Sequence, residues 1–372
     1  MKVFLFACIE KNIGDDLFVK LLCERYPHVE FIISSEARYG SLERIPNLTF
    51  SDTLKKWGEL STRGSRNKLK ALAAKLLQSC CRLALPRCDV GVSIVGNAFK
   101  NKEYTGWKQS RWIRERVGLV KRFYLISTNF GPYSDERWRT DFDKIFPKMA
   151  DVCFRDRYSY RLFSHHSNIR FAPDAVISMG RQERAGEGSK KVIISLIDCS
   201  FHARSEELKA ACKAYEQKMI ELTDILVGLG YSVTLLNSNT LQDKPACDRI
   251  VEKCVSGRSG KITVVNYDGD LDVIRTLYEN CSFVVATRLH TIVLAWLYGL
   301  PVVPIVYDIK VGNLLDACGF GGARFMIDSP ADYGSEEILT AVKDYDFTLS
   351  QETMSLAQEQ FSALDRELGK NN

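Results

Sequence analysis

The chain has 372 residues, more than a single hydrophobic core usually serves, so two domains are expected. Hydrophobic residues make up 45% and charged residues 26%, which is the ordinary balance of a soluble globular enzyme. The formal net charge of +5 permits an anionic substrate or a membrane-surface contact, but it is too small to indicate a nucleic-acid partner, and none is expected.

The N-terminal half predicts alternating strands and helices. Residues 3–9 are apolar and predict a first buried strand rather than a signal peptide, because a charged stretch follows at once without a cleavage site. Apolar spacing predicts a helix over 15–25, and buried strands are expected at 31–33, 89–95 and 123–127. Such alternation indicates parallel strands joined by crossover helices.

Residues 55–87 form a strongly basic segment with a single acid, Glu59. Leucines recur in it at helical spacing, and a basic amphipathic helix of this kind can lie on an anionic membrane. The alternative is a solvated basic face on an ordinary packed helix. The basic residues are Lys55, Lys56, Arg63, Arg66, Lys68, Lys70, Lys75, Arg82 and Arg87, and the leucines are Leu69, Leu72, Leu76, Leu77 and Leu83.

A polar, glycine-bearing stretch at 181–191 marks the predicted domain boundary. We expect two Rossmann-like α/β domains facing a cleft, residues 1–180 and 191–345. A C-terminal helix within 346–372, at 351–368, is expected to cross back to the first domain.

The second domain repeats the alternation of the first. Strands are expected at 191–197, 231–236 and 262–265, with helices at about 206–229 and from about Pro245.

Twelve cysteines are scattered along the chain without a spacing suited to zinc, which predicts a reduced, cytoplasmic protein. The adjacent His165 and His166 do not suggest a metal site, so neither a metal nor a cofactor is expected. No apolar run reaches the roughly 18 to 20 residues of a transmembrane helix without a charge or a Gly-Pro break.

The most informative stretch is Arg288-Leu289-His290, where an apolar strand at 282–286 gives way to an apolar helix at 291–298. A fixed cation and a titratable imidazole beside a helix N-terminus favour an anion and a proton transfer. The alternative is an ordinary cap or salt-bridge partner.

A second cation is expected at the same sheet edge. Gly299 and Pro301 end the helix, a buried strand is expected at 302–306, and Lys310 follows it. Ligands of open parallel sheets bind outside the carboxyl ends of the strands, so these cations and His290 are expected to converge.

An ordered set of motifs carries a family resemblance. The motifs are Asn12-Ile13-Gly14-Asp15, Asn129-Phe130-Gly131-Pro132, Phe154-Arg155-Asp156-Arg157-Tyr158-Ser159, Pro173-Asp174, Arg288-Leu289-His290, Gly299-Leu300-Pro301 and Tyr307-Asp308-Ile309-Lys310. From about residue 3 to about residue 320, the chain resembles the polysaccharide pyruvyl transferase family.

The resemblance implies a GT-B-like fold with phosphoenolpyruvate as co-substrate and a hexose-containing acceptor, on which pyruvate forms a ketal. It implies that Arg155, Arg288 and His290 bind and activate the donor, with His290 the best candidate for the proton donor. Lys310 is expected to neutralise the departing phosphate. The remaining substrate-binding candidates are Asn12, Gly14, Asn129 and Leu289.

Asp15 is either a proton acceptor for the attacking hydroxyl or the N-cap of a helix that begins at Asp16. Gly96-Asn97 stands where the family commonly has a longer run of glycines, which argues against a phosphate cradle in that loop. Asp156 is expected to orient Arg155, and Asp174 to cap or pin a turn.

Two other functions stay open. A nucleotide-sugar-dependent glycosyltransferase of GT-B architecture could use the same cations for a diphosphate, although no acidic residue is placed to grip a ribose. A non-catalytic protein could use the cleft for binding only. Whether the acceptor is linked to lipid, nucleotide or polymer is also open. The resemblance suggests bacterial capsule or exopolysaccharide synthesis, and a lipid-linked acceptor would place the enzyme at the inner membrane face.

Overall fold

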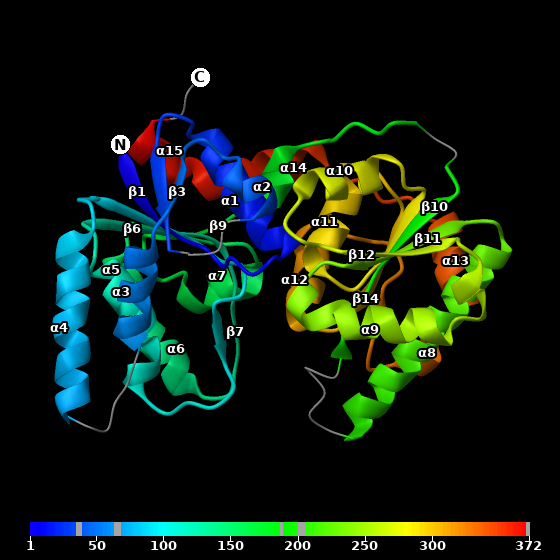
Figure 1. Cartoon of the computed structure of the whole chain (residues 1–372), viewed down its shortest axis with the longest axis horizontal. Helices are drawn as coiled ribbons and strands as arrows, with labels where there is room; N and C mark the ends of the chain where they lie inside the picture. The colour runs from blue at the N-terminus through cyan, green and yellow to red at the C-terminus, as the bar shows by residue number, and fades with distance from the viewer. Residues whose placement is uncertain (35–38, 63–67, 187–188, 200–205, 370–372) are drawn as a thin grey trace. The chain divides into compact units, whose positions relative to one another are not determined.

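The computed structural model describes residues 1–34, 39–62, 68–186, 189–199 and 206–369, which form two compact units (Figure 1). Unit 1 holds Met1–Ile9, Asp15–Ala175 and Ser355–Asn372, and unit 2 holds Glu10–Gly14 and Val176–Met354. Each unit is built on its own parallel sheet, so the predicted class of two α/β domains is confirmed.

The sheet of unit 1 has seven strands in the order β3-β2-β1-β4-β6-β8-β9, all paired in parallel. Its strands are near-continuous apolar runs because helices cover both faces. They are β1 (Lys2–Phe6), β2 (Glu30–Ile33), β3 (Leu48–Phe50), β4 (Val90–Ile94), β6 (Arg122–Thr128), β8 (Asp151–Phe154) and β9 (Ile169–Phe171), beside a separate parallel pair, β5 (Phe99–Asn101) and β7 (Phe130–Tyr133).

Phenylalanines from several elements of unit 1 pack edge to face in its core. The Phe130 ring lies 4.9 Å from that of Phe163 and 5.4 Å from that of Phe142, between centroids. The helices of this unit are α1 (Ile13–Arg25), α2 (Gly40–Glu43), α3 (Asp52–Thr62), α4 (Lys68–Ala84), α5 (Arg111–Val117), α6 (Glu136–Asp143), α7 (Arg157–Phe163) and α15 (Ser362–Leu368), with 3-10 turns η1 (Trp107–Ser110), η2 (Phe146–Lys148) and η7 (Gln358–Phe361).

The sheet of unit 2 has six parallel strands in the order β12-β11-β10-β13-β14-β15. They are β10 (Lys191–Ser195), β11 (Ser232–Asn237), β12 (Ile262–Asn266), β13 (Phe283–Ala286), β14 (Val302–Val306) and β15 (Phe325–Met326). The helices are α8 (Glu206–Gly228), α9 (Thr240–Lys253), α10 (Leu271–Glu279), α11 (Leu289–Leu297), α12 (Ile309–Ala317) and α13 (Ser335–Lys343), with 3-10 turns η3 (Ala175–Met179), η5 (Val255–Arg258) and η6 (Pro330–Asp332).

Two local predictions are wrong. The helix expected from Pro245 begins a turn earlier, at Thr240, because Gln242 and Asp243 both donate their backbone N–H to the Asn239 carbonyl. Helix α1 begins at Ile13, so Asp15 lies inside its first turn and is not an N-cap. The segment expected to be helical at 351–368 is helical over those residues, as α14 (Gln351–Ala357), η7 and α15 in succession.

The C-terminal segment packs on the rest of unit 1 through a partly buried polar network. Arg25 makes two hydrogen bonds to the Asp365 carboxylate, at 2.8 and 2.6 Å, and the Tyr26 hydroxyl donates to the same carboxylate at 2.7 Å. The buried Gln360 donates to the carbonyls of Ala172 and Pro173. Residues 355–369 therefore pack as part of unit 1, although their sequence follows unit 2.

Within the described residues, no helix is both long enough and apolar enough to span a lipid bilayer.

The Arg25–Asp365 pair gives a stability prediction. Replacing Asp365 by Asn removes the charge that Arg25 and Tyr26 share, and we expect a loss of about 2 kcal/mol in the free energy of unfolding. Glu24→Gln is the control, because Glu24 pairs with Lys20 on the exposed face of α1 and is expected to contribute less than about 0.5 kcal/mol. Urea unfolding measures both, and equal effects would contradict the prediction.

Candidate functional site

Arg288 stands at the junction of β13 and α11 in unit 2. It is the N-cap residue of α11, and its extended backbone turns the side chain toward α9. The guanidinium donates to both carboxylate oxygens of Asp243, through Nε at 2.8 Å and through Nη2, and at 3.3 Å to Gln242. The side chain of Asp243 is fully buried and that of Arg288 is 12% exposed. The cation therefore has one fixed orientation.

The electrostatic surroundings keep Arg288 charged. Burial opposes the charge, but Tyr307 and Asp243 outweigh it, so the pKa of Arg288 is raised. The junction itself is held by Thr287, whose hydroxyl donates to the Ser195 carbonyl at 2.8 Å, and by Thr291, whose hydroxyl donates to the Arg288 carbonyl at 2.6 Å.

His290 lies in the first turn of α11, and its imidazole packs directly on Gly14. A Cβ atom at position 14 would stand 1.7 Å from the Nδ1 atom of His290, so only glycine leaves room for the ring. The Gly14 N–H donates to Asn12 Oδ1 at 3.0 Å, which is the hydrogen bond of an N-cap side chain. The conformation of this loop and the position of the imidazole are thus coupled.

Residues 10–14 are anchored to unit 2 by backbone contacts. Asn12 forms an antiparallel bridge with Asn239, and the Ile13 N–H donates to the Ser238 carbonyl at 3.2 Å. Asn12 and Gly14 were predicted to belong to the first domain, whereas the structure places their loop in unit 2, with Gly14 against His290. Asp15 follows in unit 1.

Tyr307 and Lys310 follow β14, the strand next to β13. Asp308 caps α12 by accepting the Lys310 backbone N–H at 3.1 Å. The Lys310 ammonium lies 5.3 Å from the centroid of the Tyr307 ring, and the Arg288 guanidinium carbon lies 5.8 Å from it. Burial by itself would raise the pKa of Tyr307, but Lys310 and Arg288 outweigh it and lower that pKa.

The structure therefore brings Arg288, His290, Lys310, Asn12 and Gly14 together within unit 2. Leu289 lies between Arg288 and His290 with its side chain buried. Sequence reasoning missed Asp243, which orients Arg288. It named Tyr307 within a motif but gave no role to this residue, which lies beside both cations. Asp243 follows β11 in no recognisable motif, and only the strand order shows that it can reach Arg288.

Arg155 forms a second cluster, in unit 1, directly after β8. Its guanidinium donates to Asp174 at 2.8 Å and to Asn129 at 2.8 Å, and the residue is only 6% exposed. A Cβ atom at Gly96 would lie 2.8 Å from Nη1 of Arg155, so glycine is required there for close packing on the arginine.

Asp156 has a structural role in this cluster. It is the N-cap of α7, where its carboxylate accepts the Ser159 N–H at 2.7 Å and the Ser159 hydroxyl at 2.8 Å. The Ser159 oxygen in turn accepts the Phe130 N–H at 2.7 Å, which fixes the backbone next to Asn129. Asp174, expected to pin a turn, is the ion-pair partner of Arg155.

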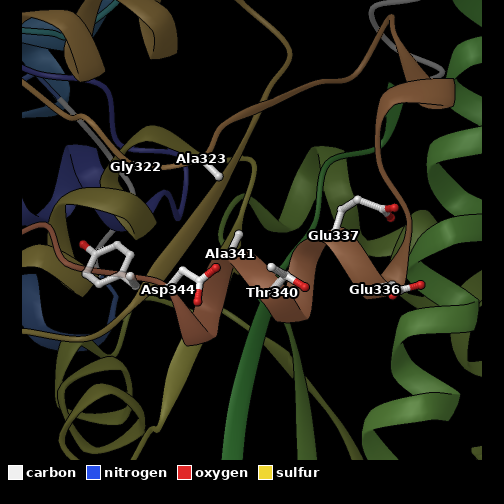
Figure 2. Close-up of a pocket in the computed structure, with 8 residues that line it drawn as sticks. Gly322, Ala323, Glu336, Glu337, Thr340, Ala341 and Asp344 are labelled. Carbon is white, nitrogen blue, oxygen red and sulfur yellow. The ribbon is translucent and has the colours of Figure 1, made fainter.

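Two further polar features lie outside these clusters. Asp143, His165 and His166 in unit 1 have potential ligand atoms within 4.8 Å of one another, and both imidazoles contact the same oxygen of Asp143. A hollow of about 350 Å³ in unit 2 lies between α13 and Gly322-Ala323 (Figure 2). Its ionisable lining groups are Glu336, Glu337, Asp344 and Tyr345, with no cation among them, so it is unsuited to an anionic donor.

Solved structures share the fold. The UDP-GlcNAc 2-epimerase of Methanocaldococcus jannaschii aligns over 98% of this chain and 100% of its own, with 10% identity and a TM-score of 0.55. Alr3699/HepE of Anabaena, solved in complex with UDP, aligns over 98% and 96%, with 12% identity and a TM-score of 0.50. At such identities the likeness concerns the fold alone, and the GT-B-like expectation is confirmed. No curated protein matches the chain in sequence.

The sequence model of the family described as polysaccharide pyruvyl transferase matches residues 12–309. The match runs from the Asn12-Gly14 loop to α12 and includes Arg155, Arg288 and His290. The chain belongs to the polysaccharide pyruvyl transferase family.

Proposed function

We propose that this protein transfers pyruvate from phosphoenolpyruvate to a sugar, forming a ketal across two hydroxyl groups. One observation carries the proposal: within unit 2, an oriented arginine and an imidazole share the start of α11, and Lys310 at the start of α12 faces the same tyrosine as Arg288. Phosphoenolpyruvate bears a phosphate and a carboxylate, and such cations at helix starts suit both groups.

Arg288 is the proposed donor clamp. Guanidinium binds carboxylate and phosphate oxygens through paired N–H groups, which an ammonium group cannot do. Asp243 already holds Nε and Nη2, so the side chain has little conformational entropy left to lose when a donor binds. Lys310 would neutralise the departing phosphate.

His290 is the proposed proton donor. Protonation of C3 turns the enol carbon into a methyl group and leaves an oxocarbenium-like centre at C2, which one sugar hydroxyl attacks. The second hydroxyl closes the ring as the C2–O bond to phosphate breaks. Two hydroxyl protons are released, one replacing the proton given by His290 and one leaving with phosphate or solvent. Asp15 is the proposed acceptor of the proton from the first attacking hydroxyl, and it passes this proton to solvent, from which His290 is reprotonated.

No redox cofactor is part of this proposal, because protonation, addition and loss of phosphate change no oxidation state. The proposal assigns no role to a metal. Arg155 remains a proposed donor ligand on the resemblance alone, with Asn129 as a substrate contact. The pairing of Arg155 with Asp174 and Asn129 also supports the loop structure of unit 1. Leu289, whose side chain is buried, would act through its backbone.

The acceptor is proposed to be a hexose of a polysaccharide or of its precursor. A lipid-linked precursor in bacterial capsule or exopolysaccharide synthesis would place the enzyme at the cytoplasmic membrane surface. Mass spectrometry of candidate acceptors incubated with phosphoenolpyruvate would identify both the sugar and its carrier.

The competing function is a nucleotide-sugar-dependent glycosyltransferase, since the same cations suit a diphosphate. Incubating the protein with acceptor sugars and either phosphoenolpyruvate or UDP-sugars separates the two. Release of inorganic phosphate from phosphoenolpyruvate supports the proposal, and consumption of a UDP-sugar with no phosphate release would contradict it.

His290→Ala removes the proposed proton donor without removing a cation that binds the donor. We expect kcat to fall about 10²- to 10⁴-fold while phosphoenolpyruvate still binds. His165→Ala, at an exposed histidine of unit 1, is the control and should keep wild-type turnover. Near-wild-type turnover of His290→Ala would exclude His290 as the proton donor and make Tyr307, with its lowered pKa, the next candidate.

Arg288→Ala should weaken phosphoenolpyruvate binding at least about 100-fold, because the paired hydrogen bonds to the donor are lost. The change also leaves Asp243 buried without its partner, so Arg288→Lys is needed beside it. The lysine keeps a positive charge but not the paired geometry, and it should fold yet bind the donor weakly. Calorimetric titration measures the affinity, with Arg275→Ala on the exposed face of α10 as the control. Wild-type affinity in Arg288→Lys would contradict a paired contact.

Gly14→Ala tests the coupling between the loop and the imidazole. The added methyl group collides with His290, so we expect a loss of about 1–3 kcal/mol in stability and a fall in turnover. Gly58→Ala is the matched control: nothing lies within 4 Å of its Cβ position in α3, and the change should stabilise by up to about 1 kcal/mol. Thermal unfolding and phosphate release measure both variants, and unchanged turnover in Gly14→Ala would show that the ring position is not critical.

A further inference from the structure

Helix α4 of unit 1 presents an apolar face outward. Leu72 is 56% exposed, Leu76 60% and Leu83 87%, and Leu77 is also exposed. These four leucines are among fourteen large apolar side chains that are exposed in the described part of the chain. Scattered exposed leucines are ordinary, but a contiguous group of them marks a contact surface.

The opposite face of α4 is the one that packs on the protein. Cys81 and Leu85 belong to the buried core, Ala74 packs against it, and the buried Gln78 donates to Glu115 at 3.3 Å. The helix lies beside α3 at the edge of unit 1 (Figure 1). The core of unit 1 is therefore complete without Leu72, Leu76 and Leu83. The outward position of these leucines differs from the alternative of an ordinary packed helix, in which the leucines would face the core.

Three of the outward leucines, Leu72, Leu76 and Leu83, form one stripe, with cations along its side. Positions 72, 76 and 83 fall within about 40° of one another at 100° per residue. Lys75 and Arg82, both exposed, share a row about 60–80° away from Leu72. Residues 68–84 include no aspartate or glutamate. Arg63 and Arg66 of the basic segment lie outside the described residues.

We propose that α4 docks the protein on anionic phospholipid bilayers. Leu72, Leu76 and Leu83 enter the acyl boundary, while Lys75 and Arg82 contact headgroup phosphates. An apolar stripe with basic residues along its edge is the pattern of a helix lying in the membrane interface. With 17 residues the helix is about 25 Å long, and its charges prevent it from spanning the bilayer.

Charge favours lipid over a second copy of the chain as the occupant. In a two-fold dimer through this face, each stripe would meet its own copy. Lys75 and Arg82 of one copy would then face the same cations of the other copy and repel them. Helix α4 contains no acidic residue that could pair with these cations. Anionic headgroups supply the missing negative charge.

The link from this surface to the reaction rests on the proposed function, since a lipid-linked acceptor would lie in the same membrane. The surface itself does not depend on that proposal. None of its residues takes part in the donor site, so the membrane docking and the pyruvyl transfer can be refuted independently of each other.

Sedimentation with vesicles of phosphatidylcholine alone, or with about 30 mol% phosphatidylglycerol, tests the docking of the full-length protein. We expect at least tenfold tighter binding to the anionic vesicles, weakened when salt is raised from about 0.1 M to about 0.5 M. The variant Leu72→Ser/Leu76→Ser/Leu83→Ser should bind at least tenfold more weakly and unfold at the same temperature, because these side chains are exposed.

The matched control is Ile225→Ser/Leu229→Ser/Val255→Ser, which removes three exposed apolar side chains from unit 2 and should leave vesicle binding unchanged. Equal binding of the α4 variant and wild type, or wild type that ignores anionic vesicles, would overturn the proposal. A dimer in sedimentation equilibrium that the α4 variant abolishes, without vesicle binding, would overturn it in favour of self-association.

Phosphate release with a water-soluble acceptor separates this inference from the proposed function. The α4 variant should release phosphate at the wild-type rate, because its donor site is unchanged. Vesicle binding without phosphate release would refute the pyruvyl transfer but support membrane docking through α4. Phosphate release without vesicle binding would refute the docking but support the pyruvyl transfer.

Discussion

The buried ion pair between Arg288 and Asp243 is the interaction on which the candidate site depends. Asp243 lies on α9 and Arg288 begins α11, so the pair joins the helices that follow β11 and β13. Taking both charges out of water is costly, and the pair is retained because two hydrogen bonds offset that cost. The pair fixes the orientation of the guanidinium at a helix start. The ring of Tyr307, which follows β14, lies beside this guanidinium, and Lys310 at the start of α12 lies beside the same ring.

Glycine is used in the same way in both units, to let a charged or titratable side chain lie against the backbone. Gly14 makes room for the imidazole of His290, and Gly96 for the guanidinium of Arg155. Neither contact requires an unusual backbone conformation, so the constraint comes from volume alone. The loop at Gly96, which does not resemble a phosphate cradle in sequence, thus has a packing role, and its neighbour Asn129 donates its backbone N–H to the Gly96 carbonyl.

Much of the fold was predictable because buried parallel strands are apolar runs between helices. Strands β4 and β14 and helix α8 appear within a residue or two of their predicted bounds. The start of α9 was not predictable. Pro245 suggested that the helix begins there, whereas it begins after Asn239, whose carbonyl accepts the first backbone hydrogen bonds, and no sequence motif marks that position. Arg288, His290 and Lys310 could be placed by strand order. The roles of Asp243 and Tyr307 could not be predicted, because they exist only through contacts between elements.

Both units are discontinuous in sequence, which limits how the gene could be divided. Residues 10–14 leave unit 1 between β1 and the rest of α1, and residues 355–372 return to it after the whole of unit 2. A fragment cut at the single boundary near residue 175 would supply unit 2 without Asn12 and Gly14, and unit 1 without Gln360 and Asp365. Neither unit can therefore be replaced by the corresponding unit of a relative through a single exchange of sequence. A short segment from the other end of the chain must be exchanged with it.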